Sequence, residues 1–261
     1  MSDSTSQRVS ESASQRVSKP ANQQITQSPN HEMPRTIGTL TEKSLHAAIK
    51  DYLAQPGDQI ETSLDGYVID ILRGDQLIEI QTRNFSAMKR KLNALLRAGH
   101  HVRVVHPLPV VKWIVRQTGN GELIGRRKSP TQRRPVEVFR QLVYIPHLLP
   151  HPNLSVEVLL THQEEIWRDD GQGSWRRKHW SLYDHRLLEV IGRAGFESAD
   201  DYLGLIPGDL PRPFTNRELA HALKITPGLA GKMTYTLRAA GWLTEVGKRG
   251  RALLFSLNTE H

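Results

Sequence analysis

Two carboxylates and a glutamine lie close together in the stretch between residues 65 and 82. The stretch alternates apolar and polar residues and is rich in Ile and Val, which predicts strands, and Gly74-Asp75 predicts a two-residue hairpin turn between them. Counting outward from that turn, Asp70 lies directly opposite Glu79, with their Cβ atoms about 4.5 to 5.5 Å apart. Side chains alternate along a strand, so Gln81 shares the face of Glu79. Four isoleucines fill the opposite face: Ile69, Ile71, Ile78 and Ile80.

This carboxylate pair predicts a metal site. Two carboxylates side by side on an otherwise apolar hairpin repel each other, and one of them would have to take up a proton. A divalent cation removes that conflict, and hard oxygen ligands suit Mg²⁺. We therefore expect Asp70 and Glu79 to bind Mg²⁺. The alternative is a solvent-facing acidic pair on a half-buried sheet, which is the commoner fate of exposed carboxylates.

The elements around the hairpin follow the order helix, strands, helix, strand. Apolar residues spaced by three and four predict a helix over residues 41–53, which Pro56-Gly57 ends. Asn84 is a suitable cap for a second helix, which Gly99 stops. Residues 101–109 then read as a buried strand closed by prolines. We expect residues 37–110 to form a mixed α/β core.

With this element order, residues 40–108 resemble the PD-(D/E)XK nuclease superfamily, which implies an α/β (mixed) restriction-endonuclease-like core. Members carry an Asp on one strand and Glu-x-Lys on the next. The resemblance implies that Asp70 and Glu79 are catalytic metal ligands and that Gln81 positions the attacking water. Asp65 is a rival metal ligand near the start of the same strand, and Glu42 resembles a glutamate that some members carry on their first helix.

Gln81 departs from the superfamily pattern. A lysine there supplies positive charge near the attacking water, and a glutamine does not, although some restriction enzymes and competence-related nucleases carry Glu-x-Gln. The departure leaves open a degenerate domain that does not cut. Lys89 or Lys91 on the following helix can replace the missing charge, but both also fit as solvated or phosphate-facing residues. The whole chain also resembles an uncharacterised prokaryotic family of unknown function, which implies no activity.

The carboxyl-terminal residues predict two helices followed by a hairpin. Thr215 caps the first helix, Pro227 begins the second, Gly241 stops it, and the GKRG turn joins two strands. This order resembles winged helix-turn-helix domains, in which the second helix enters the major groove and the wing contacts the DNA backbone. The expected nucleic-acid contacts are Lys232, Arg238, Lys248, Arg249 and Arg251. The alternative is a protein-docking or dimerisation module.

The rest of the chain divides by composition. Residues 1–36 are rich in Ser, Gln, Asn and Pro and predict a disordered tail. Residues 111–180 read as a strand-rich extension with a basic loop at 125–134. From Leu182 to Ala199 the pattern reads as helical, so residues 181–261 are expected to hold a helical linker and the winged helix-turn-helix.

Overall composition narrows the classes of function. None of the 261 residues is cysteine, which excludes thiol catalysis, disulfides and Cys-type zinc sites. The net charge of +8 favours a polyanion, so DNA is the expected partner. There is no apolar run of the roughly 18 to 20 residues that a membrane span needs, and no secretory signal, so we expect a cytoplasmic protein with no membrane partner.

Two functions fit these patterns. The first is a metal-dependent nucleic-acid phosphodiesterase, with Mg²⁺ as cofactor, whose winged helix holds DNA while an activated water attacks the phosphodiester. The second is a non-catalytic DNA-binding regulator or adaptor with a degenerate nuclease fold. Gln81 favours the second function, and the facing of Asp70 and Glu79 favours the first.

Overall fold

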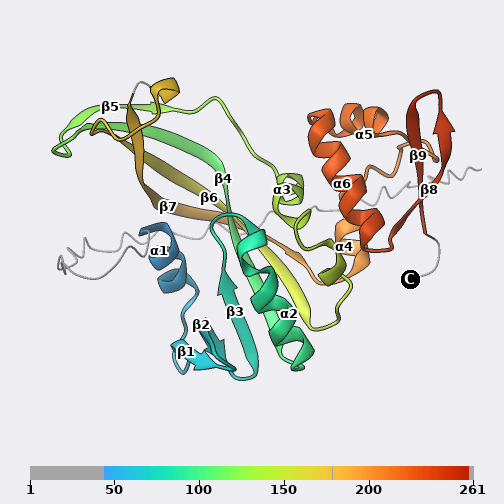
Figure 1. Ribbon diagram of the computed structural model, residues 1–261, viewed down its shortest axis with the longest axis horizontal. Coiled ribbons are helices and arrows are strands. Elements are labelled where there is room, and N and C mark those ends of the chain that lie inside the picture. Colours follow the sequence, from blue (N-terminus) through green and yellow to red (C-terminus); the bar gives the residue numbers. More distant parts are fainter. Residues whose placement is uncertain (1–43, 178, 259–261) are drawn as a thin grey trace, which may run out of the picture. The chain divides into compact units, whose positions relative to one another are not determined.

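A computed structural model describes residues 44–177 and 179–258, which belong to one compact unit, Thr41–His261 (Figure 1). The predicted tail at 1–36 and Glu42 lie outside the described residues. A mixed sheet of seven strands has the order β1-β2-β3-β4-β6-β7, with β5 paired to β4, and β8 and β9 form a separate hairpin. The strands are β1 (Gln59–Leu64), β2 (Tyr67–Arg73), β3 (Gln76–Ile80), β4 (His101–Thr118), β5 (Leu123–Lys128), β6 (Leu154–Asp169), β7 (Trp180–Phe196), β8 (Leu243–Arg249) and β9 (Ala252–Leu257).

Helices and short 3₁₀ turns cover the sheet and form most of the carboxyl-terminal part. They are α1 (Ser44–Leu53), η1 (Phe85–Met88), α2 (Lys89–Arg97), η2 (Pro135–Val138), α3 (Phe139–Leu142), η3 (Pro146–Leu148), η4 (Trp175–Arg177), α4 (Ala199–Leu203), α5 (Asn216–Leu223) and α6 (Pro227–Ala239). No helix in the described part of the chain is long and apolar enough to cross a membrane.

The first half of the sheet confirms the predicted order of elements. Strands β1, β2 and β3 form an antiparallel meander, and the crossover through α2 brings β4 parallel to β3. Helices α1 and α2 lie on different faces of this sheet, because their apolar residues belong to two separate clusters. In the α1 cluster, Leu45, Ile49 and Leu53 pack on Ile71, Ile78 and Ile80. In the other, the leucines of α2 pack with Leu77 of β3.

Strand β2 is irregular at Asp70, which corrects one prediction. Ile71 pairs with Ile78 as predicted, but Ile69 belongs to the α2 cluster and not to the face of the other isoleucines. The pairing of β2 with β3 stops at Ile71, and the Asp70 carboxylate accepts the Ile80 N–H in place of a main-chain partner. On the other side of β2, Glu61 has a left-handed backbone with φ 51°. These breaks interrupt the strict alternation of side chains on which the prediction depended.

Strand β4 runs through Pro107 and Pro109, although the sequence predicted that prolines would close it. The Val105 carbonyl accepts the Gln81 N–H, so the backbone of Val105 faces β3. Because the direction repeats every second residue, the backbone nitrogens of Pro107 and Pro109 face the same side. Strand β3 ends at Ile80, so no β3 residue lies beside the two prolines. Their missing N–H groups therefore cost the sheet no hydrogen bond. As a result, β4 continues to Thr118, across the expected domain boundary at 110.

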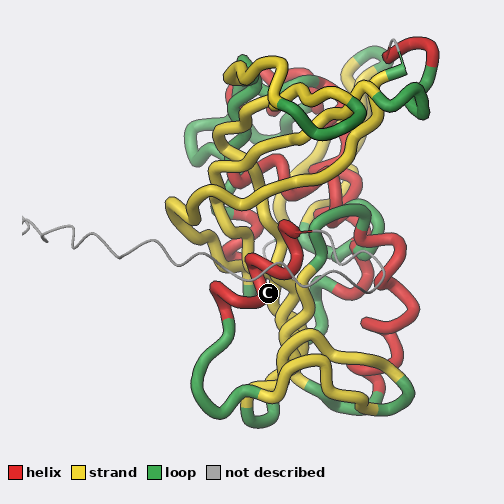
Figure 2. Tube along the Cα trace, turned by 90° about the vertical axis from the view of Figure 1, so that its left-hand side faces the viewer, coloured by secondary structure: helices red, strands yellow, loops and turns green. Residues whose placement is uncertain are grey.

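The predicted helix from Leu182 to Ala199 is wrong, because most of this stretch is strand β7. It pairs antiparallel with β6 along nearly its whole length and satisfies the backbone groups of that long edge. The pairing contains three register shifts, at Leu160/Thr161, His162/Gln163 and Ile166/Trp167. Each shift breaks the two-residue alternation, so the strand does not look like one in the sequence. In Figure 2 the long strands form a continuous twisted layer.

The carboxyl-terminal part confirms the predicted order of two helices and a hairpin. Thr215 forms a capping box with Glu218 at the start of α5, Pro227 occupies the first turn of α6, and Gly241 has φ 84° after α6. The turn of the hairpin is Gly250-Arg251, so Lys248 and Arg249 lie in β8. This part shares a core with the sheet: Tyr202 stacks between Phe196 and Trp242, with ring centroids 5.0 Å apart in both pairs.

Candidate functional site

Asp70 lies in β2 between the sheet and α1. Its Oδ2 accepts the Ile80 N–H at 2.7 Å and lies 3.3 Å from Nε2 of His46, which α1 supplies. Burial alone would raise the pKa of Asp70, but the hydrogen bonds from His46 and Ile80, with the positive charges of His46 and Lys91, hold that pKa below its usual value. Asp70 is therefore a carboxylate at neutral pH.

Glu79 lies on the neighbouring strand and is only 6% exposed. Its Oε2 is 2.5 Å from Nζ of Lys91, a residue of α2, and its Oε1 has no hydrogen-bond partner within the described residues. Burial raises the pKa of Glu79 to about 7, and the nearby Asp70 carboxylate adds to this rise, although Lys91 opposes it. Lys91 thus pairs with Glu79, and Asp70 is near enough for its charge to act on the Glu79 carboxyl.

Gln81 and Asp65 do not join this cluster through any hydrogen bond. Just past β3, the Gln81 amide nitrogen donates to the Asn84 carbonyl at 2.7 Å, and the Gln81 carbonyl accepts from Nδ1 of His106 at 2.7 Å. Asp65 lies in the β1–β2 turn with φ 51°, and its Oδ2 is 2.6 Å from Nε2 of His100. Within the described residues, no three His, Asp or Glu side chains are grouped as a metal site.

Two of the contacting residues come from the helices and not from the hairpin. Lys91 was one of two lysines that the sequence offered as a source of charge, and its Nζ also donates to the Val68 carbonyl at 2.5 Å. His46 was missed. The signal in the sequence was the pair His46 and Lys50, four residues apart on one face of α1, where Lys50 forms an ion pair with Glu61 at 2.5 Å.

The basic residues of the carboxyl-terminal part differ in how far their charge is already neutralised. Arg238 is 2.7 Å from Glu245, and Arg249 is 2.6 Å from Glu218. Lys232 is half-buried on α6. Lys248 and Arg251 are exposed and form no ion pair with the described residues, so these two carry the charge most open to an anionic partner.

Comparison with known proteins places this site in a family. Residues 43–197 match the family described as "Domain of unknown function (DUF8091)", a stretch that contains His46, Asp70, Glu79 and Lys91. The chain belongs to this family. It is also 31% identical over 224 residues to an uncharacterised protein of Treponema pallidum (strain Nichols), an alignment that covers 84% of this chain and 87% of the relative. No solved structure matches the chain.

The family match covers only part of the molecule. The DUF8091 match ends at residue 197, just after β7, so it includes the whole seven-stranded sheet and leaves out α5, α6 and the β8–β9 hairpin. The candidate acidic site therefore belongs to the family domain, and the basic hairpin residues lie outside that domain.

Proposed function

We propose that this protein is a metal-dependent nucleic-acid phosphodiesterase with a PD-(D/E)XK-like core. The observation that carries the proposal is the ion pair of Glu79 with Lys91 on β3 and α2, beside an Asp70 carboxylate whose charge acts on Glu79. The succession of α1, the antiparallel β1–β3 meander, α2 and a parallel β4 supports a restriction-endonuclease-like core.

Lys91 supplies the positive charge that the Glu-x-Lys pattern has and Gln81 lacks. In the Glu-x-Lys pattern the lysine lies on the strand, and this chain has Gln81 there. An ammonium group from α2 lies against the Glu79 carboxylate, so positive charge reaches the cluster from the helix. In this role Lys91 would stabilise negative charge that develops on the phosphate during attack. Gln81 then serves to order the turn that follows β3 through its bond to Asn84.

The carboxylates present fit a magnesium ion. Glu79 Oε1 is buried without a hydrogen-bond partner in the described part of the chain, an arrangement that a cation would relieve. Mg²⁺ is commonly held by one or two carboxylates together with water and substrate phosphate oxygens, so Asp70 and Glu79 suffice on the protein side. When bound there, the ion would polarise the phosphate and activate the attacking water. His46 and the Ile80 N–H would keep the Asp70 carboxylate oriented.

We interpret the carboxyl-terminal helices and hairpin as a winged helix-turn-helix, and this interpretation supports DNA as the substrate. Helix α6 follows a tight turn after α5, as a recognition helix does, and the β8–β9 hairpin presents Lys248 and Arg251 without acidic partners among the described residues. Exposed cations of this kind bind phosphates and hold the nucleic acid.

The test is cleavage of plasmid and oligonucleotide DNA with Mg²⁺, with Mn²⁺ and with chelator. Asp70→Asn should abolish metal-dependent cleavage while metal-free DNA binding persists, because asparagine removes the charge and retains an acceptor for the Ile80 N–H. Lys91→Gln should also reduce cleavage. Asp51→Asn is the matched control, since Asp51 is an exposed carboxylate of α1 with no part in the proposed site, and it should cut like wild type.

A non-catalytic DNA-binding regulator or adaptor is the second candidate. It is favoured by Gln81, whose side chain is bonded to Asn84 and brings no charge. If wild-type protein cuts no DNA or RNA with any divalent metal but binds DNA, this second function replaces the first.

A further inference from the structure

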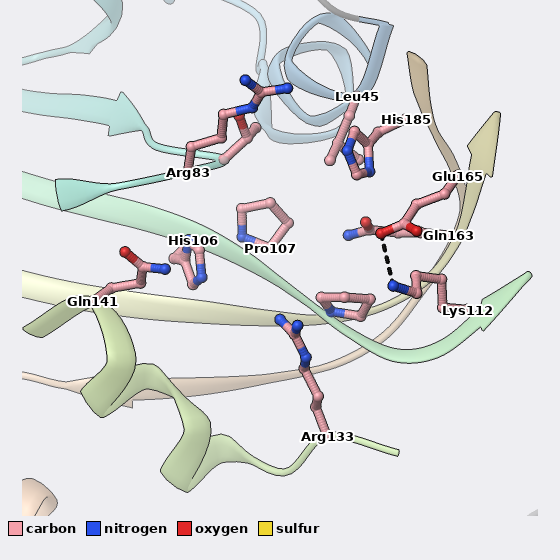
Figure 3. Close-up of a pocket in the computed structure, with 12 residues that line it drawn as sticks. Leu45, Arg83, His106, Pro107, Lys112, Arg133, Gln141, Gln163, Glu165 and His185 are labelled. Atoms are coloured by element: carbon pink, nitrogen blue, oxygen red, sulfur yellow. Dashed lines mark hydrogen bonds and ion pairs between the residues drawn. The ribbon is translucent and has the colours of Figure 1, made fainter. Parts of the chain in front are cut away.

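A pocket of about 110 Å³ lies beside the residues that directly follow β3 (Figure 3). It is lined by residues of α1, α3, β4, β6 and β7 and by the loops that follow β3 and β5. Its charged and polar walls include Arg83, Lys112, Arg133, Glu165, His106 and Gln163. In Figure 3 the Arg133 side chain reaches from the loop before η2 toward the strands, and Lys112 lies against Glu165.

The pocket carries an excess of positive charge. Lys112 is 2.7 Å from Glu165, so these two groups neutralise each other. Arg83 and Arg133 form no ion pair within the described part of the chain. Two guanidinium groups around one small pocket favour a ligand with several anionic oxygens, which their fixed N–H donors bind in pairs.

The polar floor of the pocket is buried and held in place by hydrogen bonds. His106 is 5% exposed, and its Nδ1 donates to the Gln81 carbonyl, which directs the other ring nitrogen away from that bond. Gln163 is 3% exposed and donates to Thr161 Oγ1 at 2.8 Å, and Thr161 donates to the Leu108 carbonyl. A floor ordered in this way is a preformed site and not a chance gathering of surface arginines.

The position of the pocket links it to the acidic cluster. Thr82 and Arg83 line the pocket and directly follow Gln81 in the chain, and Leu45 lines it beside His46, the partner of Asp70. Arg83 also borders a wider hollow lined by Trp175, Arg176 and Trp180. Trp175 is 76% exposed, so its ring can stack on a base.

We infer that this pocket binds the terminal phosphate of a nucleic-acid strand and places the end of that strand beside the acidic cluster. A pocket of about 110 Å³ is several times larger than the roughly 10 to 15 Å³ that one water molecule needs, so a phosphate group fits in it. The exposed Trp175, which lines the same wider hollow as Arg83, suits the first base. If the protein also has the proposed function, it would cut the strand at a set distance from the phosphorylated end, and this consequence rests on that function.

Binding without cleavage tests the pocket. Full-length protein with chelator is titrated into one fluorescent oligonucleotide made with a 5′-phosphate, with a 3′-phosphate, or with hydroxyls at both ends. One phosphorylated form should bind at least about tenfold tighter than the hydroxyl form, or ~1.4 kcal/mol. Arg133→Gln should remove that preference, and Arg133→Lys should restore part of it because it keeps the charge. Arg127→Gln removes an exposed arginine of β5 outside the pocket and should change nothing.

The outcomes separate this inference from the proposed function. Equal binding of all three oligonucleotides, or a preference that Arg133→Gln leaves intact, overturns the inference even if the protein cuts DNA. Inorganic phosphate that raises the melting temperature through Arg133, with no preference among the oligonucleotides, identifies a small phosphate as the ligand and also overturns it. A preference that depends on Arg133 in a protein that cuts nothing upholds the pocket and refutes only the proposed function.

Discussion

His106 should make the stability of the protein depend on pH in a direction that one substitution reveals. The imidazole is 5% exposed, lies edge-on against Phe85 at 5.3 Å and donates from Nδ1 to the Gln81 carbonyl. Burial lowers the pKa of His106 to about 4, and the charge of Arg133 lowers it further, although the bond to Gln81 opposes the change. In the folded protein the ring therefore stays neutral at pH values where a free histidine is protonated.

The sign and size of the change in stability with pH follow from the difference in the His106 pKa between the folded and unfolded states. An unfolded chain holds its histidine at a pKa near 6.5, so between about pH 6.5 and pH 4 the unfolded state binds a proton that the folded state does not. Stability is lost as the pH falls through this window. With a folded pKa of about 4, the contribution of His106 drops by about 2 kcal/mol from pH 7.5 to pH 5. Glu79, whose pKa is raised to about 7, acts with the opposite sign over the same range, so the wild-type profile alone does not isolate His106.

Comparison of the wild-type protein with a His106 variant does isolate the contribution of His106. His106→Asn keeps a donor near the position of Nδ1 and removes the titration. The variant should be less stable than wild type at pH 7.5, and this deficit should shrink by about 2 kcal/mol at pH 5. Urea unfolding at both pH values, without metal or phosphate, measures it. His221→Gln, at an exposed position of α5, is the control and should show no such change. A deficit for His106→Asn that is equal at pH 7.5 and pH 5 would refute the argument.

Two further predictions concern the carboxyl-terminal part. Thr215→Ala should lower the free energy of unfolding by about 1 kcal/mol, because Thr215 Oγ1 accepts the Glu218 N–H at the start of α5, whereas Thr131→Ala at an exposed loop position should have little effect in the same urea titration. Lys248→Gln and Arg251→Gln should each reduce the slope of log affinity for DNA against log salt by about one, and Arg249→Gln should reduce it less because Glu218 already neutralises it. An unchanged slope in the Lys248, Arg251 double variant would make the hairpin a protein-docking element.

Local signals in the sequence were enough to predict the elements that carry the acidic pair. Gly74-Asp75 set the turn, and the register Arg73–Gln76 through Ile71–Ile78 followed from it, because hairpin pairing depends on residues close together in the chain. The caps at Asn84 and Thr215 are equally local, since each is a side chain bonded to a backbone N–H two or three residues on.

Strand β7 and the end of β4 could not be read in the same way. The three register shifts arise from the pairing of β6 with β7. They interrupt the alternation of apolar and polar residues by which a strand is recognised in a sequence. The prolines of β4 are tolerated only because β3 has ended beside them, which is a fact about a neighbouring strand and not about residues 107 and 109.

The chemistry of the two candidate sites was decided by the tertiary structure. The sequence placed Asp70 near Glu79, but the pKa values of these carboxylates depend on burial and on His46 and Lys91, which come from two helices on different faces of the sheet. The pocket gathers Arg83, Lys112 and Arg133 from three separate segments. Charge, desolvation and hydrogen bonding act through space, so side chains far apart in the sequence set them once the sheet has brought those side chains together.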